Sequence, residues 1–320
     1  DNIQPKTLEV ALEPLNYNEE RLTEQRVKDI MAEKLAYSEV NSYIWYNNTY
    51  NSSIGIGERG NVRLLNPHAK DMNILRDSMV PGMLEFTEMN RKSMDEFSIF
   101  EIGSVFSAQD FRSKCMEHKN LCVLTASKYK NEDILFYELK GVLTFLIKLL
   151  RNTEPEYRTV GEGSMYPWTH PVKSVEVCLN GESAGYISVV HPQIRQNIDR
   201  KLNVACFELN MSSLHNAVRK ETKFAEPSRY PEVTLDFSFL VGKSQQFDRV
   251  DSDLAGFSSD VLMSFRFIDI YTGKGLPEDK KSMTFRFTIG SREKTLNSEE
   301  INEFSSKLLR YMEEKGYALR

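Results

Sequence analysis

Long apolar runs, an excess of basic charge and a secretory leader are all missing from this 320-residue sequence. The best apolar stretch, 141–150, is interrupted by Thr144 and Lys148 and falls short of the roughly 20 residues that a membrane-spanning helix needs. The sequence opens with Asp1-Asn2-Ile3 rather than with a basic and then apolar segment, so we expect no signal peptide. The formal net charge is −5, so any contact with nucleic acid must come from a local patch.

Cysteine and histidine are also scarce, and neither is arranged for metal binding. The four cysteines lack C-x-x-C spacing and the five histidines are scattered, so we expect no zinc site and a reduced, cytoplasmic protein. Cys122 with His118 or His191 could form a nucleophile and base, but Cys122 lies within an apolar strand-like run, which favours an inert buried thiol. His170 and His191 each precede proline, which favours a structural role at strand ends.

The composition is 40% hydrophobic and 27% charged, which is typical of a folded chain, and the length favours two domains. Local patterns predict the elements of the first domain in order. They are a helix capped by Asn18, a strand at 42–46, a loop at 47–53, a helix opened by Pro81 and ending near Asp95, short strands at 97–101 and 105–106, a buried strand at 121–126, a helix at 136–150, and an antiparallel meander of 175–179, 185–190 and 204–209 with a turn at Asn180-Gly181.

We place the domain junction at 225–230, where Pro227 and Pro231 punctuate a polar turn. The predicted order after it is strand 233–241, helix 245–256, strand 261–271, strand 281–289, a helix from Asn297 to Lys315, and strand 317–319. A β-α-β-β-α-β order is that of the ferredoxin-like fold. The sequence thus predicts an α+β protein with a first domain at 1–225 and a ferredoxin-like domain at 226–320.

Motifs along the whole chain resemble the C-terminal part of phenylalanine–tRNA ligase β subunits. In the second domain they are Pro231-Glu232-Val233, Asp269-Ile270-Tyr271, Gly273-Lys274-Gly275-Leu276-Pro277, Lys280-Lys281-Ser282 and Thr295 to Ile301. In the first they are Leu65-Asn66-Pro67, Leu75-Arg76, Ser78 to Leu84, Phe100-Glu101-Ile102-Gly103, Val105-Phe106, Trp168, His170-Pro171, Gly185, His191-Pro192 and Phe207-Glu208-Leu209. The resemblance implies a class II synthetase-like antiparallel sheet domain followed by an anticodon-binding domain. It also implies that the family's N-terminal editing and tRNA-binding domains are missing from this chain.

Some residues depart from the family pattern, and the residues of a working class II active site are absent. Val172 stands where glycine is usual after His170-Pro171, and Leu235-Asp236 replaces an Arg-Asp pair. ATP binding in class II synthetases needs arginines to neutralise the triphosphate. The run Phe100 to Phe106 has no arginine, and no Gly-x-Gly-x-Gly-x-x-Arg follows. We therefore expect no catalytic residue and no cofactor in this chain, while the complete enzyme uses ATP and magnesium.

The candidate RNA-binding surface lies on the second domain. Alternation along 281–289 places Met283, Phe285, Phe287 and Ile289 toward the helices, and leaves the intervening side chains on the open sheet face. A polar open sheet can bind splayed single-stranded bases, and nearby basic side chains suit phosphate contacts. The expected RNA-binding residues are Arg286, Thr284, Ser282, Arg266, Tyr271, Lys274, Lys280, Lys281 and Arg292.

The resemblance implies part of an aminoacyl-tRNA synthetase, with two α and two β subunits, whose catalysis belongs to the α subunit. Packing on the α subunit and binding of phenylalanine tRNA at its anticodon stem-loop are then the expected roles. A different interpretation is a protein-interaction scaffold without RNA affinity of its own. The second domain has 14 Lys and Arg against 16 Asp and Glu, a net charge of −2, which favours the scaffold for the isolated chain. A free-standing synthetase is disfavoured by the missing arginines.

Overall fold

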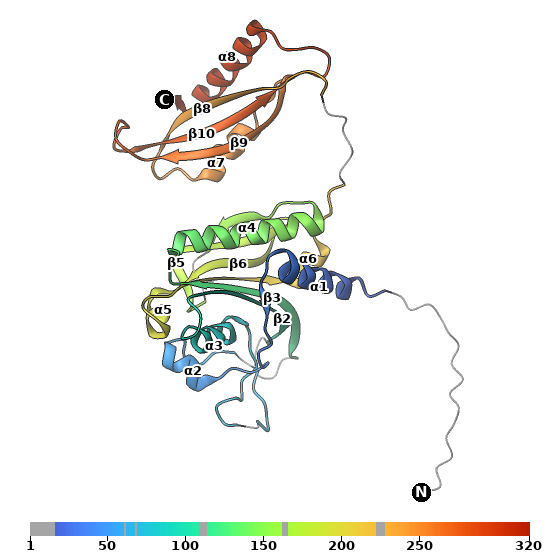
Figure 1. Cartoon of the computed structure of the whole chain (residues 1–320), viewed down its shortest axis with the longest axis vertical. Coiled ribbons are helices and arrows are strands. Elements are labelled where there is room, and N and C mark those ends of the chain that lie inside the picture. Colours follow the sequence, from blue (N-terminus) through green and yellow to red (C-terminus); the bar gives the residue numbers. More distant parts are fainter. Residues whose placement is uncertain (1–16, 61, 68, 109–113, 162–165, 222–227) are drawn as a thin grey trace, which may run out of the picture. The chain divides into compact units, whose positions relative to one another are not determined.

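The computed structural model describes residues 17–60, 62–67, 69–108, 114–161, 166–221 and 228–320. The chain divides into two compact units, Asp1–Thr222 and Lys223–Arg320, which we describe separately (Figure 1). The first three residues, the Gly163 motif and part of the expected junction at 225–230 lie outside the described residues. None of the helices in the described part has the length and apolar character that crossing a bilayer requires.

The described residues of the first unit form a seven-stranded sheet in the order β1-β2-β3-β7-β6-β5-β4. Neighbouring strands are antiparallel, except that β1 runs parallel to β2 at one edge. The strands are β1 Ser38–Glu39, β2 Glu96–Ser107, β3 Met116–Ser127, β4 Glu156–Thr159, β5 Thr169–Leu179, β6 Glu182–Val190 and β7 Asn203–Asn210. The predicted meander is confirmed, with Asn180 and Gly181 both at positive φ in the β5–β6 turn.

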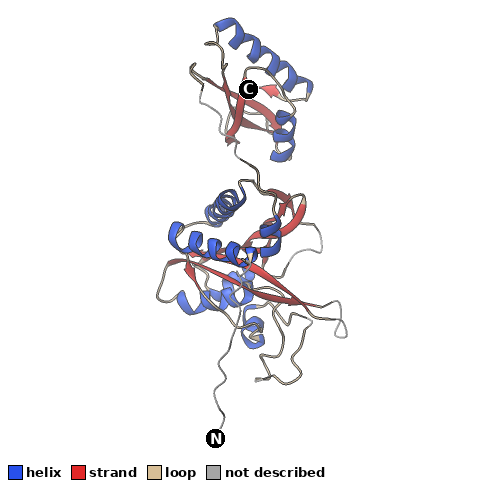
Figure 2. Ribbon diagram, turned by 90° about the vertical axis from the view of Figure 1, so that its right-hand side faces the viewer, coloured by secondary structure: helices blue, strands red, loops and turns tan. Residues whose placement is uncertain are grey.

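Helices cover both faces of this sheet (Figures 1 and 2). On one face α1 (Glu19–Asp29), α4 (Glu132–Arg151) and α6 (Met211–Asn216) enclose a core around Phe100, Val123 and Phe207. On the other, α2 (Asn48–Ile54), α3 (Val80–Asn90) and α5 (Pro192–Ile198) enclose a core around Leu124, Trp168 and Cys206. A short π-helical turn, η1 (Ile30–Lys34), extends α1. The predicted cap is confirmed, because the Asn18 side chain accepts a hydrogen bond from the Arg21 amide.

Three local predictions for the first unit are wrong. Residues 47–53 are not a loop, because Asn47 caps α2 and Gly55 ends it in a left-handed conformation. Residues 42–46 form no ladder strand and make only the isolated bridge Trp45–Leu75. The two short strands around Gly103 are one strand, β2. A Cβ at Gly103 would lie 2.3 Å from Arg76 Nη2, so glycine is required there because the guanidinium packs on the strand.

The second unit has the predicted β-α-β-β-α-β order, with the sheet arranged β11-β8-β10-β9. Its elements are β8 Val233–Gly242, α7 Phe247–Ala255, β9 Leu262–Tyr271, β10 Lys280–Ile289, α8 Ser298–Glu314 and β11 Ala318–Leu319. Both helices cover one face, where Phe285, Phe287 and Ile289 are fully buried as the alternation predicted (Figure 2). Asn297 and Glu300 form a capping box that begins α8.

Candidate nucleic-acid interface

The face of the second sheet that the helices leave open is polar. Register places every second residue of each strand on this face, opposite the apolar row of Met283, Phe285 and Phe287. The exposed or half-buried members are Thr234, Asp236, Ser238 and Leu240 on β8, Thr284, Arg286 and Thr288 on β10, and Ser264, Arg266, Asp269 and Tyr271 on β9. The structure therefore brings together four expected residues, Arg286, Thr284, Arg266 and Tyr271.

A cross-strand row of charged residues occupies the middle of this face. Arg286 donates from Nε and Nη2 to the two carboxylate oxygens of Asp236, with both distances 2.7 Å, and Arg266 stands opposite Arg286 on β9. The Arg286 hydrogen bonds lower the pKa of Asp236, with a smaller contribution from the charge of Arg266. This fork uses two of the five N–H donors of Arg286 and fixes its plane. Sequence reasoning missed the role of Asp236, although its position directly opposite Arg286 follows from the strand register.

The prediction that the Ser282 hydroxyl is exposed on the open face is wrong. Ser282 is fully buried, and its Oγ has no hydrogen-bond partner. The register sets Ser282 between Tyr271 and Leu240, and the Arg320 guanidinium lies 4.7 Å from the centre of the Tyr271 ring. We attribute the burial to these larger neighbours, which come from other strands. The Tyr271 hydroxyl also donates to the Lys274 carbonyl, so the ring is held at both its face and its tip.

The expected lysines do not act as one group. Lys274 and Lys280 line a hollow of about 370 Å³ at the β9–β10 loop, and Lys243 joins them from the end of β8. The Lys281 ammonium instead donates to the Gln245 carbonyl at 2.7 Å. Arg292 follows the other end of β10, roughly 30 Å away at 3.3 Å per residue. The sequence signal for Lys243 was weak, because this lysine is 31 residues before Lys274.

In the first unit, the residues that resemble a synthetase motif are used inside the fold. Arg76 and Glu101 form an ion pair at 2.9 Å, with side chains 4% and 3% exposed. Arg76 also donates to the Ser104 carbonyl and to Ser42 Oγ, which in turn donates to Glu101. A guanidinium so enclosed has no surface to offer to a triphosphate. Its charge is neutralised internally instead.

A second buried polar group is the Glu208 carboxylate. Ser78, Asn120, Tyr186 and the Met79 amide all donate to it. Burial raises the pKa of Glu208, and the hydrogen bonds only partly offset this effect. Trp168 Nε1 donates to the Tyr186 hydroxyl at 2.9 Å and extends the network into the core. The donors come from different elements, so the network ties α3 to the sheet.

The histidines and Cys122 have structural positions. His170 Nδ1 accepts hydrogen bonds from the amides of Val172 and Lys173, each at 3.0 Å, and His191 Nδ1 accepts from Gln193. Burial lowers the pKa of His170, which favours the neutral ring that these bonds require. Cys122 is fully buried, and burial raises its pKa well above the ordinary thiol value, so it is no nucleophile. Within the described residues, no group of His, Cys, Asp and Glu could hold a metal ion.

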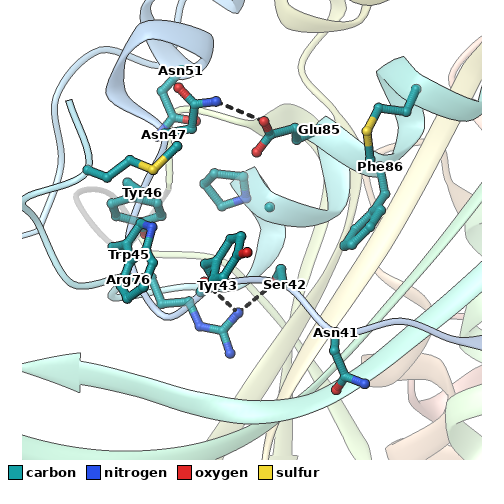
Figure 3. Close-up of a pocket in the computed structure, with 14 residues that line it drawn as sticks. Asn41, Ser42, Tyr43, Trp45, Tyr46, Asn47, Asn51, Arg76, Glu85 and Phe86 are labelled. Carbon is teal, nitrogen blue, oxygen red and sulfur yellow. Dashed lines mark hydrogen bonds between the residues drawn. The ribbon is translucent and has the colours of Figure 1, made fainter. Parts of the chain in front are cut away.

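The first unit also contains a cavity of about 380 Å³ between the segment 41–47 and α3 (Figure 3). Sequence reasoning did not identify it. Aromatic and apolar side chains form most of its wall, and a few polar side chains complete it. The lining residues are Asn41, Ser42, Tyr43, Trp45, Tyr46, Asn47, Asn51, Met72, Arg76, Pro81, Gly82, Glu85, Phe86 and Met89.

Comparison with known families agrees with both units. Residues 228–320 match the ferredoxin-fold anticodon binding domain, which defines the class of module in the second unit. Residues 3–211 match the phenylalanyl tRNA synthetase beta chain CLM domain. The chain therefore belongs to the phenylalanyl-tRNA synthetase beta chain family, and the resemblance found in its motifs is confirmed.

Curated relatives carry the same description. Proteins named phenylalanine–tRNA ligase beta subunit from Syntrophus aciditrophicus and Carboxydothermus hydrogenoformans are each 28% identical over 100% and 99% of this chain. The relative of that name from Legionella pneumophila (strain Paris) is 31% identical over 79% of the chain. The chain covers 41%, 40% and 32% of the lengths of these relatives, so it corresponds to less than half of each.

Proposed function

We propose that the chain is the C-terminal part of a phenylalanine–tRNA ligase β subunit and binds the anticodon stem-loop of phenylalanine tRNA. The observation that carries this proposal is the open polar face of a ferredoxin-fold anticodon-binding domain, with Arg286 held flat by Asp236 and Arg266 beside it. Guanidinium groups and aromatic rings on such a face suit unpaired bases. Lys243, Lys274 and Lys280 suit phosphates at the edge of the face.

The first unit, in this proposal, is a class II synthetase-like sheet domain that has no catalytic role and packs on an α subunit. The buried Arg76–Glu101 pair supports the absence of catalysis. The complete enzyme then contains two α and two β subunits in the cytoplasm, and its α subunit uses ATP and magnesium. Purified chain alone should give no phenylalanine-dependent pyrophosphate exchange. Exchange clearly above that of a heat-inactivated sample would contradict this part of the proposal.

The direct test is a titration of the chain with phenylalanine tRNA, in the absence and in the presence of the α subunit. Binding that depends on the anticodon supports the proposed role. Arg266→Ala tests the sheet face, and Arg310→Ala on α8 is a matched control because that arginine is highly exposed on a helix covering the opposite face. Equal losses in the two variants would argue against the sheet face.

The scaffold interpretation remains as a second candidate because the second domain carries a net charge of −2. Weak bulk attraction to RNA favours it for the chain without its partner. A chain that binds the α subunit, but adds nothing to the tRNA affinity or anticodon preference of the complex, would establish the scaffold function instead.

A further inference from the structure

The cavity in the first unit has unsatisfied hydrogen-bond donors in its wall. Trp45 Nε1 and Asn51 Nδ2 are buried and have no partner, and Asn51 as a whole is 1% exposed. Buried polar groups are nearly always paired, because an unpaired donor loses its bond to water without replacement. Two such donors around one cavity indicate that a hydrogen-bond acceptor completes the site when it is filled.

The mouth of the cavity is apolar and extends beyond the cavity itself. Tyr43 is 71% exposed and stacks on Trp45 with ring centres 4.9 Å apart, and Met89 of α3 is 60% exposed. Ile44 is also exposed beside them. A small molecule in the cavity would leave this rim uncovered, whereas a polypeptide covers cavity and rim together. Exposed aromatic anchors beside a pocket are typical of protein–protein interfaces.

The position of the cavity in the fold also favours a polypeptide. The segment 41–47 continues directly from β1, which is an edge strand of the sheet. Edge strands and the extended chain that follows them are common sites of contact with another chain. A side chain at Gly82 of α3 would place its Cβ only 3.1 Å from Ser42 Oγ, so helix and segment are already in close contact at the base of the cavity.

The charge at the cavity indicates what kind of segment fits. Glu85 accepts a hydrogen bond from Asn47 through one oxygen and lies at the wall (Figure 3). The basic side chain among the described lining residues is Arg76, whose charge is already paired with Glu101. The cavity therefore presents an uncompensated carboxylate, which suits a lysine or arginine of the occupant.

We propose that this cavity is the socket in which the first unit receives a segment of the α subunit. The segment inserts an aromatic or long aliphatic side chain between Trp45 and Phe86, accepts hydrogen bonds from Trp45 and Asn51, and places a basic side chain against Glu85. This inference rests on the proposed function, since it names the surface through which the chain packs on its partner.

The experiment measures binding of purified α subunit to the whole chain by calorimetry. Tyr43→Ala removes the exposed anchor, and Tyr137→Ala removes a tyrosine of similar exposure, 67%, from α4 on the other side of the sheet. We expect Tyr43→Ala to weaken binding about tenfold or more, as at interface anchors, and Tyr137→Ala to leave it within about twofold. Glu85→Lys should weaken binding by a similar factor, and more strongly at low salt. Binding to the unaltered chain should also shift the fluorescence of Trp45, since Trp168 is fully buried already.

The possible results separate this proposal from the function it rests on. Equal affinities for the unaltered chain, Tyr43→Ala and Glu85→Lys would overturn the socket and leave α-subunit packing intact. Equal losses in Tyr43→Ala and Tyr137→Ala would overturn it as well. No binding of the α subunit to the unaltered chain would overturn the packing role itself. Self-association that Tyr43→Ala abolishes, without an effect on α-subunit binding, would assign the socket to a second copy of the chain and overturn the proposed occupant.

Discussion

Arg286 and Asp236 stand directly opposite each other on β10 and β8 and are joined by two parallel hydrogen bonds, each 2.7 Å long. The side chains remain 37% and 43% exposed, so the fork lies at the surface of the open sheet face. The carboxylate holds the guanidinium in one plane and leaves its outer donors available. In the proposed complex, this plane is the rigid element against which an unpaired base can bind.

Arg286→Lys should impair anticodon discrimination nearly as much as Arg286→Ala, although lysine keeps the charge. The ammonium cannot form the planar fork with Asp236, so the orientation is lost in both variants. We expect the preference of the complete α/β enzyme for the matched anticodon to fall by roughly tenfold or more. The measurement is kcat/KM for phenylalanine tRNA and for the same tRNA with a substituted anticodon.

Arg310→Ala is the matched control for these variants, because α8 packs on the opposite face of the sheet. The second unit should stay folded in all three proteins, since the apolar core row is unchanged. A wild-type ratio of matched to substituted tRNA in Arg286→Ala would show that the sheet face does not read the anticodon.

Lys280→Ala should weaken all tRNAs alike. Lys280 lines the hollow at the β9–β10 loop with Lys243 and Lys274, away from the centre of the sheet face. A flexible ammonium contacts phosphate as a point charge and carries no base preference. The slope of log affinity against log salt should fall by about one unit. Lys307→Ala on α8, where the side chain is 63% exposed, serves as the control and should leave the slope unchanged. An altered anticodon preference in Lys280→Ala would contradict the assignment to phosphate.

Breaking the buried ion pair should destabilise the first unit strongly. Arg76→Ala leaves the Glu101 carboxylate buried without its counter-charge, which typically costs about 3–5 kcal/mol. The double change Arg76→Met with Glu101→Leu removes both charges and should be less destabilising than Arg76→Ala. The free energy of unfolding can be followed by tryptophan fluorescence, because both tryptophans lie in the first unit. A double variant less stable than Arg76→Ala would mean that the pair contributes more through its hydrogen bonds than through its charges.

The stability of the first unit should decrease as pH rises through the titration of Glu208. Burial raises the pKa of Glu208 in the folded chain, so the protonated form is favoured by folding. This contribution is fully present below the ordinary glutamate pKa of about 4.3 and is lost as pH rises through the higher folded value. Glu208→Gln cannot ionise and should lack this loss, so the stability difference between the two proteins should change with pH.

Urea unfolding of both proteins across this pH range checks the Glu208 prediction, with Glu154→Gln as the control because Glu154 is 68% exposed. A difference between wild type and Glu208→Gln that stays constant with pH would show that the four donors, rather than burial, dominate at this carboxylate.

The element order of the second unit could be predicted from the sequence because its signals are local. Alternation along 281–289 depends only on the two-residue period of a strand, and it identified Phe285, Phe287 and Ile289 as core residues. Asn297 followed by Glu300 is a capping signal within four residues. Local signals can also mislead, as at 47–53, where an asparagine-rich composition suggested a loop although Asn47 and Gly55 are ordinary helix boundaries.

The chain's motifs alone determined its family, the ferredoxin-like order and the side of β10 on which Arg286 lies. Only the tertiary structure decided what surrounds each polar side chain. Arg76 meets Glu101 across 25 residues, Ser78 meets Glu208 across 130, and Ser282 is buried between residues of two neighbouring strands. The cavity beside Trp45 joins a segment after β1 to a helix some 40 residues later. Burial, pairing and cavities depend on neighbours that are distant in sequence, and a local pattern holds no information about which distant residue completes the contact.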